Sequence, residues 1–245
     1  MSLDFLKKQE GIQETTQDKI GGGSFTLDSG LHEARIDKAY LTNSGSSKAV
    51  ALAFEFTTTE GKSYKDTIWI TNGEGKNTYL TKENKLAYLP GFETVSNIAL
   101  VTVGKELADL TPEDKVIEIY NSELAKKVPT SVQMFTELIG QTIILGLHKV
   151  KSFKQAKDQA TGKYVDTAET RETNELANVF SQAGFTALEL KAKATEVDFI
   201  KQFEEAFKSD YIKDKTKGRA TGATPGVGAG VSNTPTKSLF GAGAK

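Results

Sequence analysis

Alternation of apolar and polar residues dominates the middle of this chain. Residues 50–56 read Val-Ala-Leu-Ala-Phe-Glu-Phe, with a large apolar side chain at every second position, which predicts a half-buried β-strand. The run 65–71 contains Ile-Trp-Ile and follows a turn signal at 60–61, so we expect the two strands to pair as a hairpin. Upstream, 31–41 is also strand-like, and an irregularity near 38–39 fits a β-bulge.

Three further strands are expected downstream of this hairpin. A short one covers 116–120 and a long one covers 142–153. After a polar loop around Gly162, residues 171–180 are expected to return against the long strand.

Helical signals are fewer than strand signals. The segment 91–103 is rich in β-branched residues but too long for a typical strand, so we expect a helix closed by Gly104. Thr195 followed by Asp198 resembles a capping box. The helix after it would carry three apolar side chains on one face, namely Ile200, Phe203 and Phe207. Several strands, one or two helices and no regular alternation of strand and helix favour a mainly β fold, an antiparallel barrel decorated by helices.

Composition and charge change toward the C-terminus. The 245 residues carry 31 Lys and Arg against 32 Asp and Glu, and 38% are apolar, which is enough for a globular core. From Lys213 to Lys245 there are six positive residues and one negative, so this end carries +5 and the rest of the chain −6. Its glycine-rich composition predicts a mobile segment. We therefore expect a flexible N-terminal segment at 1–23, a folded domain at 24–210 and a disordered basic tail at 211–245.

Enzyme classes find little support in the sequence. There is no cysteine, and the two histidines, His32 and His148, lie on different predicted strands, so neither a thiolate site nor a His-based metal site or catalytic triad is expected. The turn at 73–77 lacks the first glycine and the final Ser or Thr of a phosphate-binding loop. We expect no enzymatic activity and no cofactor.

Segments that would place the chain in or across a membrane are not evident. The N-terminal residues lack the pattern of a secretion signal, and no run approaches the roughly 20 apolar residues that span a bilayer. We expect a soluble cytoplasmic protein with no membrane partner.

The single tryptophan gives the most informative pattern. On the strand at 65–71, Trp69 falls on the same side as Lys65, Thr67 and Thr71, whereas a core-facing tryptophan is normally flanked by apolar residues two positions away. A flat ring beside a cation fits base stacking combined with phosphate attraction. Alternatively, Trp69 lies beneath the terminal helix or in a dimer contact. Neighbouring elements add further candidates for contacting nucleic acid, namely Lys38, Tyr40, Lys76, Tyr79, Lys149 and Lys151.

The basic tail fits the same function. Flexible cationic segments strengthen the nonspecific attraction to nucleic acid through counterion release. Near the end of the tail, Leu239 and Phe240 form its apolar pair and are candidates for docking a protein partner. The alternative is a solubilising spacer with a short docking motif, which is compatible with the first interpretation.

Several motifs occur in an order that matches a known family. They are 38–41 (Lys-Ala-Tyr-Leu), 65–72 (Lys-Asp-Thr-Ile-Trp-Ile-Thr-Asn), 89–92 (Leu-Pro-Gly-Phe), 128–130 (Val-Pro-Thr), 136–140 (Thr-Glu-Leu-Ile-Gly), 167–171 (Thr-Ala-Glu-Thr-Arg) and 235–241 (Pro-Thr-Lys-Ser-Leu-Phe-Gly). In this order the chain resembles the single-stranded DNA-binding proteins of N4-like and related tailed bacteriophages. The resemblance implies an oligonucleotide-binding (OB) fold. Such a protein would coat single-stranded DNA during phage replication and recombination, in the cytoplasm of the infected bacterium, without performing chemistry.

The tail departs from the pattern of many replication proteins that bind single strands, because theirs is acidic and this one is basic. A phage or host replication or recombination partner would therefore meet Phe240 as an apolar anchor beside Lys237. Self-association on DNA is compatible with the same role. A competing hypothesis is a self-assembling structural or scaffold protein of a virus particle, in which Trp69 and the Leu239–Phe240 pair serve protein contacts.

Overall fold

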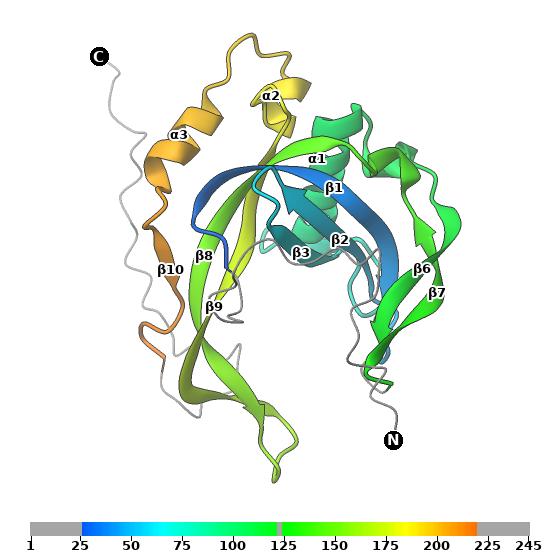
Figure 1. Ribbon diagram of the computed structural model, residues 1–245, viewed down its shortest axis with the longest axis vertical. Helices are drawn as coiled ribbons and strands as arrows, with labels where there is room; N and C mark the ends of the chain where they lie inside the picture. Colours follow the sequence, from blue (N-terminus) through cyan, green and yellow to red (C-terminus); the bar gives the residue numbers. More distant parts are fainter. Residues whose placement is uncertain (1–25, 122–123, 220–245) are drawn as a thin grey trace, which may run out of the picture.

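The computed structural model describes residues 26–121 and 124–219 (Figure 1). The strands are β1 (Gly30–Asn43), β2 (Val50–Thr58), β3 (Ser63–Trp69), β4 (Thr78–Leu80), β5 (Leu86–Tyr88), β6 (Glu113–Asn121), β7 (Lys126–Met134), β8 (Thr142–Lys157), β9 (Tyr164–Phe180) and β10 (Ile212–Asp214). The helices are α1 (Pro90–Val103), α2 (Ala187–Lys191) and α3 (Phe199–Ala206), with short 3-10 turns η2 (Leu107–Asp109) and η3 (Thr136–Leu138). The segment 1–23 and the pair Leu239–Phe240 lie outside the described residues.

Strand β1 organises the main sheet. It pairs with β2 along most of its length, with β8 through its first half, and with β7 at Tyr40. The register with β2 shifts between Ile36 and Lys38, so the bulge expected near 38–39 is confirmed. A bulge bends a strand and increases its local twist, and here it lies between the parts of β1 that pair with β8 and with β7.

The main sheet has eight strands and is curled but not closed. Its hydrogen-bonded path runs β10-β8-β1-β2-β3, with β9 on the far edge of β8 and the β6–β7 hairpin attached to β1. Within the described ranges, no pairing joins β3 to β9, and α1 instead contacts both of them. The expected mainly β, antiparallel architecture is confirmed, whereas the sheet does not form the closed barrel that the sequence suggested.

The hydrophobic core lies between the inner face of this sheet and α1. The β2–β3 hairpin forms as expected, with Leu52 opposite Ile68. The side chains of Phe54 and Phe56 point inward and stack with ring centroids 5.4 Å apart. Alternate residues of β8 and one side of α1 complete the core, including Ile143, Leu145, Leu147, Val95 and Ile98.

Helix α1 has the limits that the sequence predicts. Pro90 occupies its first turn, where a missing N–H costs nothing. Gly104 ends the helix in the left-handed region, with φ 72°, and donates its N–H to the carbonyl of Leu100. The predicted helix at 91–103 is therefore confirmed.

The expected start of α3 is wrong, and its cap comes from another helix. The helix begins at Phe199, and Asp198 makes no side-chain cap. A capping box forms instead on α2, between Thr186 and Glu189. The same Glu189 carboxylate accepts the N–H groups of Asp198 and Phe199 at 3.2 and 3.0 Å, so one residue satisfies the first turns of two helices. Helix α2 itself was not expected, and the described fold has three α-helices rather than one or two.

Helix α3 packs against β8 through aromatic rings. Phe203 is buried, and it lies so close to Gly146 that a β-carbon there would be 2.8 Å from the ring. The ring of His148 lies 4.3 Å from that of Phe207 and 5.2 Å from that of Tyr211. Burial, followed by the charge of Lys213, lowers the pKa of His148. His148 therefore belongs to an aromatic cluster of the fold.

The ordered fold continues past residue 210. Strand β10 pairs in parallel with β8, with Ile212 opposite Lys149. Glu175 on β9 accepts hydrogen bonds from Lys213 and Lys215 at 2.6 and 2.5 Å. The first cations of the expected basic tail are thus bound to the folded domain, which extends to at least residue 219.

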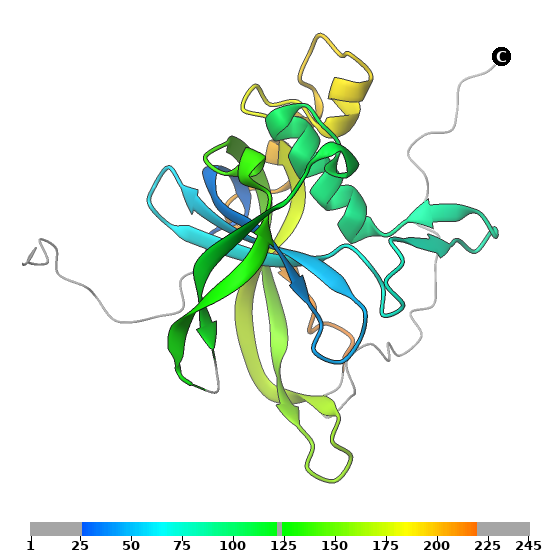
Figure 2. The same cartoon turned by 90° about the vertical axis from the view of Figure 1, so that its right-hand side faces the viewer.

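The β4–β5 hairpin is a separate two-stranded sheet. It projects from the body beside the first turn of α1 (Figure 2). The N–H of Leu89 donates to the carbonyl of Asn77 at 2.8 Å, which closes the base of the hairpin.

The contact between α1 and β3 predicts that Gly91→Ala destabilises the fold. A β-carbon at Gly91 would lie 2.1 Å from the carbonyl oxygen of Trp69, so the helix and the strand would have to separate. We expect a loss of about 2 kcal/mol in the free energy of unfolding, as for an overpacked core. Urea denaturation measures it. The control is Gly45→Ala, where no atom lies within 4 Å of the added carbon; equal stability of the two variants would contradict the close approach.

Candidate functional site

The outer face of β1, β2 and β3 gathers four of the predicted site residues. Directly opposed residues of an antiparallel pair share a face, so the registers of the three strands define rows across the sheet. These rows are Lys38–Glu55–Lys65, Tyr40–Ala53–Thr67 and Thr42–Ala51–Trp69. We call this set the three-strand face.

The aromatic side chains stand on either side of small residues on this face. Trp69, the last residue of β3, is 47% exposed, and Tyr40 on β1 is partly buried. The central strand places only Ala51 and Ala53 between them, and both alanines are buried. Since neighbouring strands are about 4.8 Å apart, the two aromatic residues originate from strands roughly 10 Å apart.

The cations of the face share one carboxylate. Glu55 lies 3.1 Å from the Nζ of Lys38 and 3.0 Å from the Nζ of Lys65. Partial burial acts to raise the pKa of Glu55, but the hydrogen bonds from Lys65 and Lys38 outweigh it and lower that pKa. The trio therefore carries one net positive charge, about 13 Å along β3 from Trp69 at 3.3 Å per residue.

The face continues onto β7, which the sequence analysis did not find. Met134 is directly opposite Tyr40, and both Met134 and Val132 are buried outside the main core. Pro129 in this strand obscures the strand pattern. The alternation in 130–134 was the signal that could have revealed it.

Lys76 and Tyr79 lie on the segment that follows β3. Lys76 pairs with Glu74 at 2.9 Å in an exposed turn. Tyr79 on β4 is exposed and has Ala87 opposite it. Both residues follow Trp69 within ten positions of the sequence, but neither is part of the three rows.

Lys149 and Lys151 are not on the three-strand face. They follow Leu147 at every second position of β8, so their side chains lie on the same side of that strand as Leu147, which belongs to the hydrophobic core. Lys149 pairs with Asp28 at 3.5 Å and with Glu172 at 3.4 Å. The structure therefore separates these two lysines from the Trp69 face.

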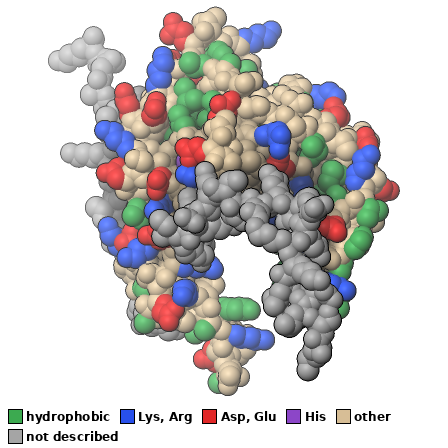
Figure 3. Space-filling model, viewed as in Figure 1, with side chains coloured by type: hydrophobic (Ala, Val, Ile, Leu, Met, Phe, Trp, Pro, Cys, Tyr) green, Lys and Arg blue, Asp and Glu red, His purple; other side chains and the backbone are tan. Residues whose placement is uncertain are grey.

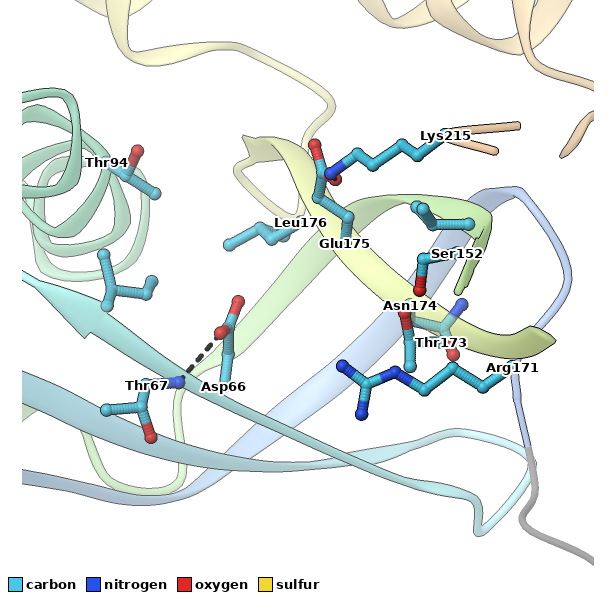
Figure 4. A pocket seen from close by; sticks show the side chains of 12 residues that line it. Asp66, Thr67, Thr94, Ser152, Arg171, Thr173, Asn174, Glu175, Leu176 and Lys215 are labelled. Carbon is cyan, nitrogen blue, oxygen red and sulfur yellow. Dashed lines mark hydrogen bonds and ion pairs between the residues drawn. The ribbon is translucent and has the colours of Figure 1, made fainter. Parts of the chain in front are cut away.

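A polar groove of about 430 Å³ lies where the sheet stays open between β3 and β9. Figure 4 shows Asp66 and Thr67 on one side and the side chains of Arg171, Thr173 and Glu175 on the other. The phenol of Tyr64 donates to Asp66 at 2.8 Å, and burial raises the pKa of Tyr64 far above its usual value. The groove combines both signs of charge, and none of its residues was predicted from the sequence as a site residue.

Charges of both signs are mixed over the surface. In the view of Figure 3, basic and acidic side chains are mixed over the visible face. Most lysines of the described residues that were expected to contact phosphate have a carboxylate partner, as Lys38, Lys65, Lys76 and Lys149 do. Any attraction for an anion on this surface is therefore local.

Comparison with known proteins does not assign this chain to a family. No protein-family model matches the sequence, and no curated protein matches it significantly. Among the residues that the structure describes, no three His, Cys, Asp or Glu side chains are grouped to hold a metal ion. None of the described helices is long and apolar enough to cross a membrane.

The shared carboxylate predicts a pH effect on stability. Because the folded state lowers the pKa of Glu55, its ion pairs stabilise the protein above the unfolded value of about 4.5. This contribution is lost as the pH falls from there through the lower, folded-state pKa. We expect Glu55→Gln to cost about 1 kcal/mol at pH 7, for two partly exposed pairs, and the difference from wild type to shrink below pH 4.5. Denaturation at several pH values measures it, and a difference that stays constant down to pH 3 would contradict the assignment.

Proposed function

We propose that this chain binds single-stranded DNA without sequence preference, with the three-strand face as the contact surface. The observation that supports it most is the exposed indole of Trp69, which shares that face with Tyr40, Lys38 and Lys65. Aromatic rings stack on any base, and cations attract the phosphates, so this combination suits a strand of any sequence.

The order of elements supports the OB-fold interpretation. Strands β1, β2 and β3 are followed by α1 and later by the antiparallel pair β8 and β9, and β1 pairs with both β2 and β8. An OB fold is a five-stranded, partly open barrel whose second and third strands carry the oligonucleotide. The β6–β7 hairpin would then be an insertion. On this proposal, Trp69 and Lys65 lie on the binding strands.

Magnitudes indicate how such binding would work. One stacked base contributes roughly 1–3 kcal/mol, so two rings supply roughly 2–6 kcal/mol, which alone corresponds to dissociation constants from tens of millimolar to tens of micromolar. Tighter binding requires phosphate contacts or several copies along one strand. The net charge of the Lys38–Glu55–Lys65 row is only +1, so DNA phosphates would have to compete with Glu55 for the two lysines.

The biological setting of this proposal follows from the family resemblance. The protein would coat single strands during phage replication and recombination in the cytoplasm of the infected host, as a binding protein and not an enzyme. Leu239 and Phe240 would dock a replication or recombination partner. Both residues lie outside the described ranges, and the proposal for them depends on the sequence motif.

We predict that Trp69→Ala weakens binding to a dT oligomer by about tenfold, since the loss of one stacked base costs about 1–2 kcal/mol. Fluorescence anisotropy of labelled dT measures the dissociation constant. Tyr120→Ala is the matched control, because Tyr120 is exposed on β6 and alternates onto the side of that strand opposite to the face shared with Tyr40. Similar affinities of the two variants would remove Trp69 from the site.

Salt dependence separates stacking from charge. We predict that Lys65→Ala loses affinity mainly at low salt, because phosphate contacts act through counterion release, whereas the loss in Trp69→Ala is similar at low and high salt. The protein has a single tryptophan, so its emission reports directly on this face. Quenching by added dT supports DNA binding; quenching that follows protein concentration alone supports the competing scaffold hypothesis.

A further inference from the structure

The β4–β5 hairpin exposes apolar side chains that the proposed DNA contacts do not use. Leu80 is 65% exposed and Leu86, directly opposite it, is 70% exposed. Tyr88 lies two residues from Leu86 and therefore shares the same side of the hairpin, while Tyr79 points to the other side. Because a two-stranded sheet is marginally stable in water by itself, an exposed Leu–Leu pair on its tip is unfavourable unless another surface covers it.

The same side of the hairpin leads into a groove that combines polar and apolar side chains. The ring of Tyr88 stacks on that of Phe92 in α1, with centroids 4.9 Å apart. Both rings line a groove of about 440 Å³, which is also lined by Leu188 on α2, a residue that is 76% exposed. The exposed Leu80–Leu86 pair at the tip is therefore followed by a groove whose large apolar residues are Tyr88, Phe92 and Leu188.

The two ends have opposite charge. At the tip, Lys82 and Lys85 outnumber Glu83, which leaves one positive charge. Around the groove, Glu93 and Glu106 outnumber Lys191, which leaves one negative charge. Complementary charges of this kind fix the orientation of a contact more than they strengthen it.

We propose that this surface binds a second copy of the same chain and forms a two-fold dimer. Tip and groove lie on one side of the hairpin, so a two-fold axis between two hairpins sets the tip of each copy against the groove of the other. Such an arrangement is self-complementary and closes after two subunits. It buries Leu80 and Leu86 on Tyr88, Phe92 and Leu188 twice over, and it pairs the positive tip with the negative groove in both contacts.

The test is sedimentation equilibrium of the full chain without DNA, so that it is independent of the proposed DNA binding. We expect a concentration-dependent dimer for the wild type. Leu86→Asp at the tip and Leu188→Asp in the groove should each weaken dimerisation by at least about tenfold, because each places a carboxylate against the apolar side chains of the contact. Val116→Asp is the matched control: Val116 is equally exposed on β6, away from this surface, and its variant should dimerise like the wild type.

A charge exchange distinguishes docking from a loss of folding. Lys82→Glu makes the tip negative, and Glu93→Lys makes the groove positive, so each single variant should dimerise more weakly at low salt. The double variant restores opposite charges and should recover dimerisation. A wild type that remains monomeric up to about 100 μM, which would mean a dissociation constant weaker than that concentration, would overturn the proposal. So would a dimer that both Asp variants leave intact, or a double variant weaker than either single one.

Discussion

The alternation of side chains along β2 is the constraint on which both faces of the sheet depend. Its large residues, Leu52, Phe54 and Phe56, all point to the core, and its small ones, Ala51 and Ala53, point outward. A shift of the register by one residue would exchange the two sets and bury the wrong side chains. The core contacts of these three large side chains therefore place the two small alanines between Tyr40 and Trp69 on the outer face. The geometry of the candidate site is thus a consequence of how the core packs.

The bulge in β1 determines which of its side chains lies opposite Glu55 on the outer face. Before the bulge, Ile36 is opposite Phe56, and after it Lys38 is opposite Glu55. If the same sequence paired without a bulge, Asp37 would be opposite Glu55, and Lys38 would be opposite Phe54 and would point to the core. The bulge thus brings a second lysine to Glu55, whose first partner, Lys65, is opposite it on β3. With one carboxylate between two lysines, the row carries a net charge of only +1, and both lysine side chains are partly exposed and reachable by a competing anion.

Local patterns predicted the parts of the fold that local interactions determine. The β2–β3 hairpin, the bulge in β1, the helix closed by Gly104 and the pairing of β8 with β9 all have signals within a few residues. The start of α3 could not be predicted in this way, because the carboxylate that caps it belongs to Glu189 on another helix. Strand β10 was missed for the same reason: the glycine- and lysine-rich composition after residue 211 indicates a flexible segment, whereas Lys213 and Lys215 meet Glu175, nearly 40 residues earlier in the chain.

The candidate site likewise has features that local patterns predict and features that depend on contacts between distant segments. Alternation within one strand was enough to place Trp69 on the outer face, since the side of a strand on which a residue lies is a local property. The partners of the lysines were not accessible from the sequence, because ion pairs between strands depend on register. Lys149 shows this clearly: it has the residue type expected for a phosphate contact, but its strand turns it toward Asp28 and Glu172. A count of lysines in a sequence therefore overestimates the charge that a surface offers to DNA.

The open edge between β3 and β9 links the two proposed surfaces. Because β9 does not pair with β3, α1 covers the opening, and its first turn must approach the end of β3 at Gly91. The same approach fixes the backbone of Trp69 and the base of the β4–β5 hairpin, which begins nine residues later and returns to α1 at Leu89. A copy docked on the hairpin would therefore lie next to the aromatic end of the three-strand face. Two such faces held by one dimer could engage one DNA strand together, and the second contact would then form at a high effective concentration. In this arrangement, modest stacking and a small net charge at each site are sufficient, because the affinity comes from joining two weak contacts on rigid elements.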